Sequence, residues 1–182
     1  MRRMIWPRGV RALHWILAIS MIASFATHEV DGPWHEWPGY IALAAALLRL
    51  AWGLLPATPQ APARYSRFAD FLRSPKHTWQ HLHQVLRKQE PRYLGHSPLA
   101  GYLVSALLLV SIGAGISGWM LTLDRFFGVA WVMNFHNIAG YAIVPLVLLH
   151  WIAIAYGSWR RRENLLASML HGEKLIRPPA PK

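Results

Sequence analysis

Residues 126–159, FFGVAWVMNFHNIAGYAIVPLVLLHWIAIAYGSW, contain no Asp, Glu, Lys or Arg, and this stretch decides the fold. Three other parts of the chain are almost as free of charge: residues 12–28 and 97–123 carry none, and residues 37–55 carry only Arg49. About 20 apolar residues suffice for a helix to cross the ~30 Å hydrocarbon core of a bilayer. The sequence therefore predicts an all-α integral membrane protein, built as a four-helix bundle. The expected spans lie near residues 11–28, 37–55, 98–121 and 136–158.

The basic residues are distributed unevenly about these spans. Of the 19 Lys and Arg residues, 17 precede the first span, lie between the second and third, or follow the fourth, and so share one side. The opposite side carries Arg125 and four acidic residues, Glu29, Asp31, Glu36 and Asp124. Because cytoplasmic loops of membrane proteins are enriched in Lys and Arg, we expect both termini in the cytoplasm. The net charge of +11 is then explained by topology and anionic lipid, without a nucleic-acid partner.

The segments outside the spans are basic and amphipathic. Apolar residues recur at helical spacing in residues 65–72, 79–85 and 165–170, with basic residues between them. This pattern is typical of helices that lie on a membrane surface, here the cytoplasmic one. Residues 173–182, with three prolines, are expected to form a disordered tail. The basic N-terminus and the apolar stretch after it also resemble a secretory signal peptide, although His14 lies within that apolar stretch.

Four of the ten histidines form two matched pairs. The pattern H-x-x-x-G-Y occurs at His35 and His136, where the chain enters a span from the outer side, and H-W-I occurs at His14 and His150, toward the inner side. His136 and His150 are 14 residues apart, which on a helix is about 21 Å along the axis and only ~40° from one face. One helix thus offers imidazoles to two layers of the membrane. The glycine after His35 or His136 lies one turn deeper and lets a flat ring approach the backbone.

Two imidazoles per layer, facing each other across a helix bundle, suit the axial positions of haem iron. We predict that His35 and His136 bind an outer haem and that His14 and His150 bind an inner haem. His28 is an alternative outer ligand because it also follows His14 by 14 residues, but it lacks the glycine. The other alternative is that these histidines only hydrogen-bond between helices. The absence of cysteine excludes covalent haem attachment and thiolate metal sites.

Arg49 is the one formal charge within the expected hydrocarbon cores. It follows His35 by 14 residues, just as His150 follows His136, so it should lie at the depth of the inner haem. A guanidinium there suits a haem propionate, and snorkelling to the inner surface is the alternative. The histidines of the basic segments, by contrast, are expected at the surface. They are His77, His81, His83 and His171.

Together these features resemble the bacterial cytochrome b561 family of four-helix dihaem membrane cytochromes b. The chain is also similar to the cytochrome b subunits of nickel–iron hydrogenase and membrane-bound formate dehydrogenase. The resemblance covers residues 5–172, and residues 1–172 are expected to form one transmembrane domain. Besides the four histidines, it rests on Arg49-Leu-Ala-Trp-Gly53, Tyr93-Leu-Gly-His-Ser-Pro-Leu99 and Arg162-Glu-Asn-Leu165. Ser97, where many relatives are expected to have Asn, and Pro38 depart from the family pattern without removing a ligand.

The resemblance implies two non-covalent haems b, electron transfer across a bacterial inner membrane and a quinone site near the inner haem. It does not fix the redox partner. We favour an electron-transfer subunit, with no catalytic residues of its own, between the quinone pool and a periplasmic c-type cytochrome, dehydrogenase or hydrogenase. A stand-alone superoxide:quinone oxidoreductase is the alternative, and a haem-handling membrane protein is a third. Since superoxide is an anion, the acidic outer residues favour a docked basic protein instead.

His96 lies in the turn Gly95-His96-Ser97-Pro98 at the mouth of the third span. One role for this turn is to begin the helix, with Ser97 as its N-cap. The other is for His96 to provide a hydrogen bond or a proton path to a quinone beside the inner haem. In either role we expect His96 to act at the cytoplasmic surface and not as an iron ligand.

Overall fold

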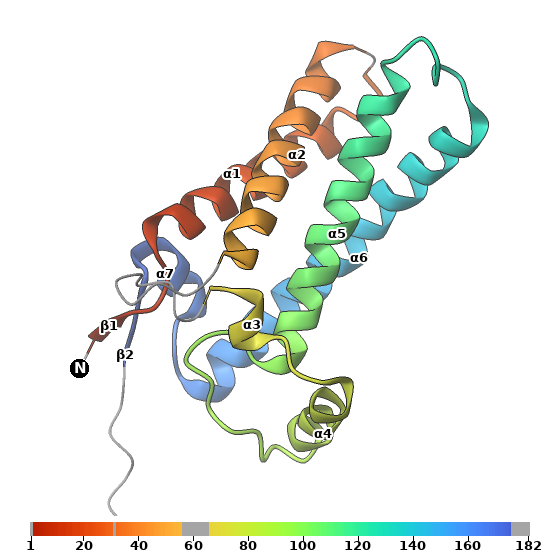
Figure 1. The fold of residues 1–182 in the computed structure, drawn as a ribbon. Helices are drawn as coiled ribbons and strands as arrows, with labels where there is room; N and C mark the ends of the chain where they lie inside the picture. Colours follow the sequence, from red (N-terminus) through yellow and green to blue (C-terminus); the bar gives the residue numbers. More distant parts are fainter. Residues whose placement is uncertain (1, 31, 56–65, 176–182) are drawn as a thin grey trace, which may run out of the picture.

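The computed structural model describes residues 2–30, 32–55 and 66–175, in which four long helices form one bundle (Figure 1). The four are α1 (Arg8–Ala26), α2 (Pro33–Leu54), α5 (Pro98–Leu121) and α6 (Ala130–Arg161). Each is long and apolar enough to cross a membrane. α1 packs along α2, α2 along α5, and α5 along α6, whereas neither α1 nor α2 packs extensively against α6. The prediction of an all-α membrane bundle is confirmed.

The helix ends differ from the predicted spans where a local start signal outweighs the hydropathy pattern. α2 begins at Pro33, four residues early, because proline at the first helical position needs no hydrogen-bond acceptor for its nitrogen. α6 is longer at both ends than residues 136–158, running from Ala130 to Arg161. α5 matches the prediction, and the Ser97 hydroxyl accepts a hydrogen bond from the Ala100 amide at 3.4 Å, so the expected N-cap is present.

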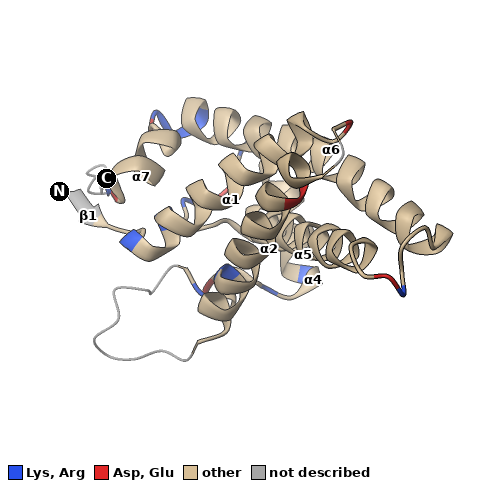
Figure 2. Ribbon diagram, turned by 90° about the horizontal axis from the view of Figure 1, so that it is seen from above, with Lys and Arg blue, Asp and Glu red and all other residues tan. Residues whose placement is uncertain are grey.

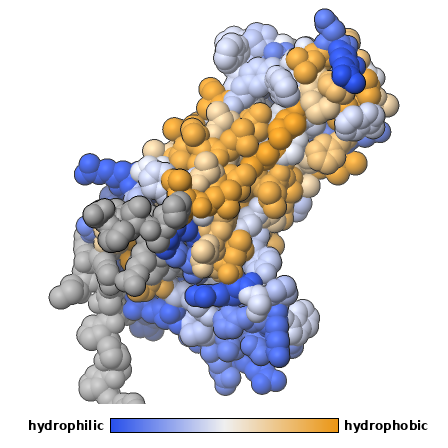
Figure 3. Space-filling view, viewed as in Figure 1, coloured by the Kyte–Doolittle hydropathy of each residue, from blue (hydrophilic) through white to orange (hydrophobic). Residues whose placement is uncertain are grey.

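The surface of the bundle is divided into an apolar middle and two polar ends. Figure 3 shows hydrophobic residues along the long helices, and Figure 2 shows these helices largely free of charge, with charged residues near their ends and in the connections. We call the end that carries residues 27–32 and 122–129 the hairpin end, and the opposite one the terminal end. Because large apolar side chains on the long helices are exposed, such as Ile19 at 64% and Ile152 at 63%, the bundle needs lipid around it.

The first and last described residues meet at the terminal end. Strand β1 (Arg2–Met4) pairs antiparallel with β2 (Glu173–Leu175), directly after the short helix α7 (Leu165–His171). Residues 173–175, expected in a disordered tail, are therefore a strand, because pairing with β1 satisfies their backbone hydrogen bonds. The rest of the expected tail, residues 176–182, lies outside the described residues.

Two short helices cover the terminal end beside the long ones. Helix α3 (Phe68–Phe71) contacts α2 and α5, and α4 (Pro75–Leu86) packs on α5, so part of each predicted amphipathic segment is helical. One expectation for these segments is wrong. His81, assigned to the surface, is only 2% exposed and its ring packs edge-on against Tyr93 at 5.2 Å between ring centroids.

Candidate functional site

Two histidines from different helices face each other near the hairpin end. His35, in the first turn of α2, and His136 of α6 have ring centroids 6.0 Å apart, with ring planes at 90°. Their helices make no extensive packing contact with each other. The two rings are therefore close to each other although their helices do not pack extensively.

Backbone carbonyls orient both of these rings. His35 Nδ1 lies 2.9 Å from the carbonyl oxygen of Ser24 in α1, and His136 Nδ1 lies 2.9 Å from that of Ala114 in α5. A carbonyl only accepts, so in each ring the Nδ1–H donates, and the lone pair is on Nε2. This arrangement is the usual way to orient a histidine that binds a metal through Nε2. Sequence reasoning missed these partners because no pattern in α1 or α5 marks a carbonyl that receives a ring nitrogen.

Three glycines lie near this histidine pair. The sequence predicts that such glycines leave room for a flat ring beside the backbone, but one of them is covered by a histidine ring. The ring of His136 lies over Gly118, where an added Cβ would be 2.9 Å from Cε1 of the ring. At Gly140, one turn deeper than His136, an added Cβ would meet no atom within 4 Å, which leaves the backbone accessible to a flat ring as expected. At Gly39 the nearest atom is the Ser24 hydroxyl oxygen, at 3.7 Å.

A second histidine pair lies toward the terminal end. His14 of α1 and His150 of α6 have ring centroids 6.4 Å apart and ring planes tilted by 52°. As in the outer layer, the two helices do not pack extensively, and both rings are partly buried. The sequence-based pairing of His14 with His150, and of His35 with His136, thus corresponds to the two pairs of rings that face each other.

Arg49 of α2 is buried beside this inner layer, with 8% of its surface exposed. Its Nη2 donates to the Ser66 carbonyl oxygen at 2.9 Å, and its guanidinium lies 5.7 Å from the centre of the Phe68 ring. Its Nη1 is buried and makes no hydrogen bond within the described part of the chain. A buried guanidinium nitrogen without a partner is costly, so the residue is suited to an anionic group placed there.

The two pairs have the spacing that a haem iron needs. An imidazole nitrogen lies about 2 Å from a bound metal, and its ring centroid about 1 Å farther, so two axial imidazoles on one iron have centroids about 6 Å apart. The observed separations are 6.0 and 6.4 Å. Among the described residues no cluster of three or more His, Asp or Glu could bind a metal ion. Haem is compatible with this because the macrocycle supplies four nitrogens and the protein only two axial ligands.

His28, the alternative outer ligand, has different neighbours. Its ring stacks on Phe25 at 5.2 Å and lies edge-on to Tyr141 at 6.3 Å, both between ring centroids. Its Nδ1 is 2.8 Å from the Phe25 carbonyl oxygen, and its Nε2 lies 3.9 Å from the exposed Glu29 carboxylate. The structure therefore brings His35, and not His28, against His136.

His96 lies at the terminal end, between two aromatic rings. The centroids of Trp6 and Phe71 are each 4.8 Å from that of His96, and its Nδ1 is buried without a hydrogen-bond partner in the described residues. Burial, and to a smaller extent the nearby charges of Arg49 and Lys174, lower the pKa of His96 to about 3. The ring is therefore neutral at physiological pH. Sequence reasoning did not find Trp6, because the pairing of β1 with β2 and the bond from the Trp6 amide to the Gly172 carbonyl are long-range contacts.

Three of the predicted acidic residues lie at the hairpin end, the end nearer to His35 and His136. Glu29 is exposed, Glu36 lies in the first turn of α2, and Asp124 is exposed beside Arg125 in the connection between α5 and α6. The fourth predicted acidic residue, Asp31, lies outside the described residues. Exposed tryptophans share this end of the bundle, at Trp34, Trp37 and Trp131.

Known protein sequences resemble this chain over most of its length. The family described as prokaryotic cytochrome b561 matches residues 5–172. A protein of Bradyrhizobium diazoefficiens named "Probable Ni/Fe-hydrogenase B-type cytochrome subunit" is 24% identical over an alignment 220 positions long, which covers 95% of this chain and 86% of the relative. No solved structure is significantly similar.

Proposed function

The chain belongs to the prokaryotic cytochrome b561 family, and we propose that it carries electrons through two haems b across a bacterial inner membrane. Family membership makes it a multi-pass membrane cytochrome b of electron transfer. The observation that carries the dihaem proposal is the pair of ring separations, 6.0 Å for His35 with His136 and 6.4 Å for His14 with His150. These four histidines would supply the axial ligands, and the bound haems would supply the one-electron redox chemistry.

Two further features support haem at the outer layer and one supports haem at the inner layer. The carbonyls of Ser24 and Ala114 fix the tautomers of the outer histidines, and Gly140 leaves the backbone of α6 open one turn deeper than His136. The Nη1 of Arg49, which has no partner among the described residues, is suited to a propionate of the inner haem. Two layers about 21 Å apart along α6 would connect the faces of the membrane.

The test is the haem content of the purified protein, measured as pyridine haemochrome. We expect two haems per wild-type chain. His35→Ala or His136→Ala should remove the outer haem and keep the inner one, and His14→Ala or His150→Ala should do the reverse. A wild-type ratio near one, or full occupancy in these variants, would contradict the ligand assignment.

The quinone pool is the proposed redox partner at the terminal end. His96 supports this proposal because its neutral ring has a buried Nδ1 available for a hydrogen bond, near the inner histidines. His96→Ala should leave both haem spectra unchanged and slow the reduction of the haems by quinol. Unchanged quinol kinetics would restrict His96 to packing between Trp6 and Phe71.

A basic periplasmic redox protein is the proposed partner at the hairpin end. The relative named as a hydrogenase cytochrome subunit supports a partner in a membrane complex. Exposed Glu29 and Asp124 at this end, with Glu36, favour a positive docking surface over entry of superoxide, the substrate of the alternative stand-alone oxidase. Electron transfer from the partner should slow as salt rises and slow again with Glu36→Lys. A rate that responds to neither change would argue against docking here.

A further inference from the structure

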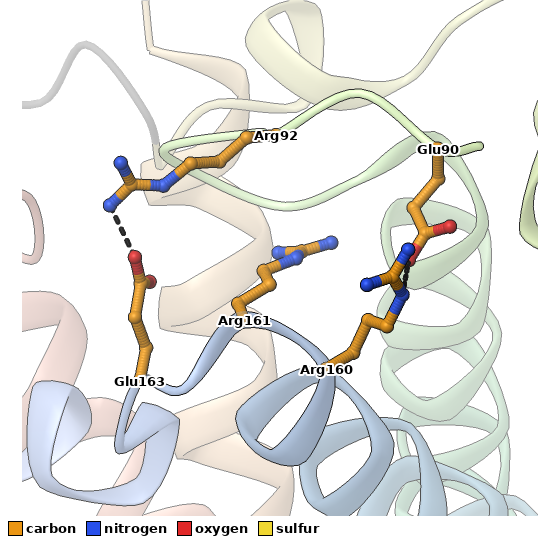
Figure 4. Close-up of a pocket in the computed structure, with 5 residues that line it drawn as sticks. All are labelled: Glu90, Arg92, Arg160, Arg161 and Glu163. Carbon is orange, nitrogen blue, oxygen red and sulfur yellow. Dashed lines mark hydrogen bonds and ion pairs between the residues drawn. The ribbon is translucent and has the colours of Figure 1, made fainter. Parts of the chain in front are cut away.

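A charged pocket of about 230 Å³ lies at the terminal end, and none of the four paired histidines lines it (Figure 4). Its walls are the last turn of α6, the residues between α6 and α7, and the segment that leads from α4 to α5. Five residues line it: Glu90, Arg92, Arg160, Arg161 and Glu163. None of these residues belongs to the haem or quinone sites proposed above.

Two ion pairs form opposite walls of this pocket. Arg92 Nη2 pairs with a Glu163 carboxylate oxygen, and Arg160 Nε lies 3.6 Å from the Glu90 carboxylate. Arg160 also donates from Nη2 to the Lys88 carbonyl oxygen at 2.7 Å. These contacts neutralise both acids of the pocket and fix the two arginines that pair with them.

Arg161 is left as the uncompensated charge. Figure 4 shows its side chain between the two ion pairs, and it makes no hydrogen bond or ion pair within the described residues. The pocket as a whole has three arginines against two glutamates. The positive field also reaches Lys174, whose pKa is lowered to about 8, mainly by burial and then by Arg161.

The same pocket holds an unused acceptor. Glu90 is nearly inaccessible, with 5% of its side chain exposed, and its Oε2 is buried without a hydrogen-bond partner in the described part of the chain. A buried carboxylate oxygen of this kind needs a donor. A ligand that satisfied both groups would therefore carry an anion for Arg161 and a hydroxyl for Glu90.

We propose that this pocket binds a phosphate ester that also carries a hydroxyl group, and that its occupant is the head group of an anionic phospholipid such as phosphatidylglycerol. The place supports a lipid, because Arg160 and Arg161 end a membrane-spanning helix and so lie at the level of the head groups. A guanidinium can also bind two phosphate oxygens at once. Phosphatidylcholine, whose head group has no net charge and no hydroxyl, should bind poorly.

The test uses the purified holoprotein and native mass spectrometry, with short-chain phosphatidylglycerol, short-chain phosphatidylcholine and inorganic phosphate as separate probes. The wild type should bind one phosphatidylglycerol in preference to phosphatidylcholine. Arg161→Gln should weaken that binding about tenfold or more, because a charge-assisted hydrogen bond is lost. Arg162→Gln is the matched control, since Arg162 is adjacent, exposed and outside the pocket, and its affinity should change less than about twofold.

Two outcomes of the binding experiment would overturn the proposal. Equal effects of Arg161→Gln and Arg162→Gln would mean that only general attraction to basic residues operates. Inorganic phosphate that binds as tightly as the lipid and displaces it would assign the pocket to a soluble phosphate. If Arg161→Gln loses haem or fails to fold, the wild-type protein is cross-linked instead with a photoactivatable phosphatidylglycerol, and the cross-linked residues are identified. Cross-links to residues 160–163 would support the site, and their absence would exclude it.

Discussion

The imidazole of His136 lies directly against Gly118 of α5: a Cβ built at residue 118 would be 2.9 Å from Cε1 of the ring. The same ring donates from Nδ1 to the carbonyl oxygen of Ala114, one turn earlier on α5, at 2.9 Å. Helix α5 contributes no proposed haem ligand, yet its contacts determine where the ring of His136, the proposed outer ligand, lies. The outer layer therefore depends on α5 as well as on α2 and α6.

Gly118→Ala is predicted to displace the His136 ring and weaken the outer haem. Overpacking of this kind costs about 1–3 kcal/mol, which corresponds to roughly five- to 150-fold in haem affinity. The inner haem should keep its occupancy and spectrum. Gly113→Ala is the matched control on α5, because its Cβ would meet only the half-exposed ring of Phe135, at 3.3 Å. Haem titration of the apoprotein measures both, and equal affinities would contradict the steric role of Gly118.

His28→Ala is predicted to leave the outer haem in place, in contrast to His35→Ala. His28 stacks on Phe25 and faces Tyr141, while the ring that faces His136 is that of His35. Loss of His28 should therefore alter the outer haem potential slightly and its occupancy not at all. Optical redox titration of the two variants side by side makes the comparison. Outer haem lost in His28→Ala and retained in His35→Ala would transfer the ligand to His28.

The repeats in the sequence predicted which histidine rings lie near each other, because each repeat fixes the histidine and its position around the helix. H-x-x-x-G-Y at His35 and His136, and H-W-I at His14 and His150, put matched rings at matched depths. The contacts that orient the rings were not predictable in the same way. The carbonyls of Ser24 and Ala114 have no residue signature, since every residue carries a carbonyl. Their positions depend on helix packing across the bundle.

The terminal end was predicted least well, because long-range pairing decides it. Residues 173–175 have no strong strand pattern, and only the neighbouring β1 makes them a strand. That pairing places Trp6 beside His96 and buries Lys174, which donates to the Leu94 carbonyl oxygen at 2.8 Å. His81 was assigned to the surface by the basic composition of its segment, yet α4 turns it inward against Tyr93.

His96 is predicted to make the protein less stable in acid. Burial holds its pKa at about 3 in the folded protein, against 6.5 when unfolded, so the unfolded chain binds the proton first. Stability is therefore full above pH 6.5 and falls as the pH drops toward 3, by roughly 1.4 kcal/mol per pH unit from this residue. Thermal unfolding between pH 7.5 and 4.5 should show a shallower loss for His96→Gln than for the wild type.

The control for this pH dependence is His77→Gln, since His77 is an exposed histidine of α4. It should follow the wild-type curve throughout. Other groups that titrate in the same range contribute equally to all three proteins, so only the difference between the curves reports on His96. A His96→Gln curve parallel to the wild type would show that the ring is protonated freely in the folded protein.

Arg49→Leu is predicted to weaken the inner haem and to lower its reduction potential. Arg49 is 8% exposed and donates from Nη2 to the Ser66 carbonyl, so its buried Nη1, which has no partner in the described part of the chain, is suited to a propionate. Positive charge nearby favours the reduced haem. If that charge contributes about 1–2 kcal/mol, its loss lowers the potential by about 40–90 mV for a one-electron couple. Arg49→Lys should recover only part of the lost affinity and potential, because lysine lacks the planar fork.

A redox titration that resolves the two haems is the measurement for Arg49→Leu, with the outer haem as the internal control. If the inner potential and occupancy stay unchanged in Arg49→Leu, the side chain serves only to hold Ser66 and Phe68 over the inner end of α2.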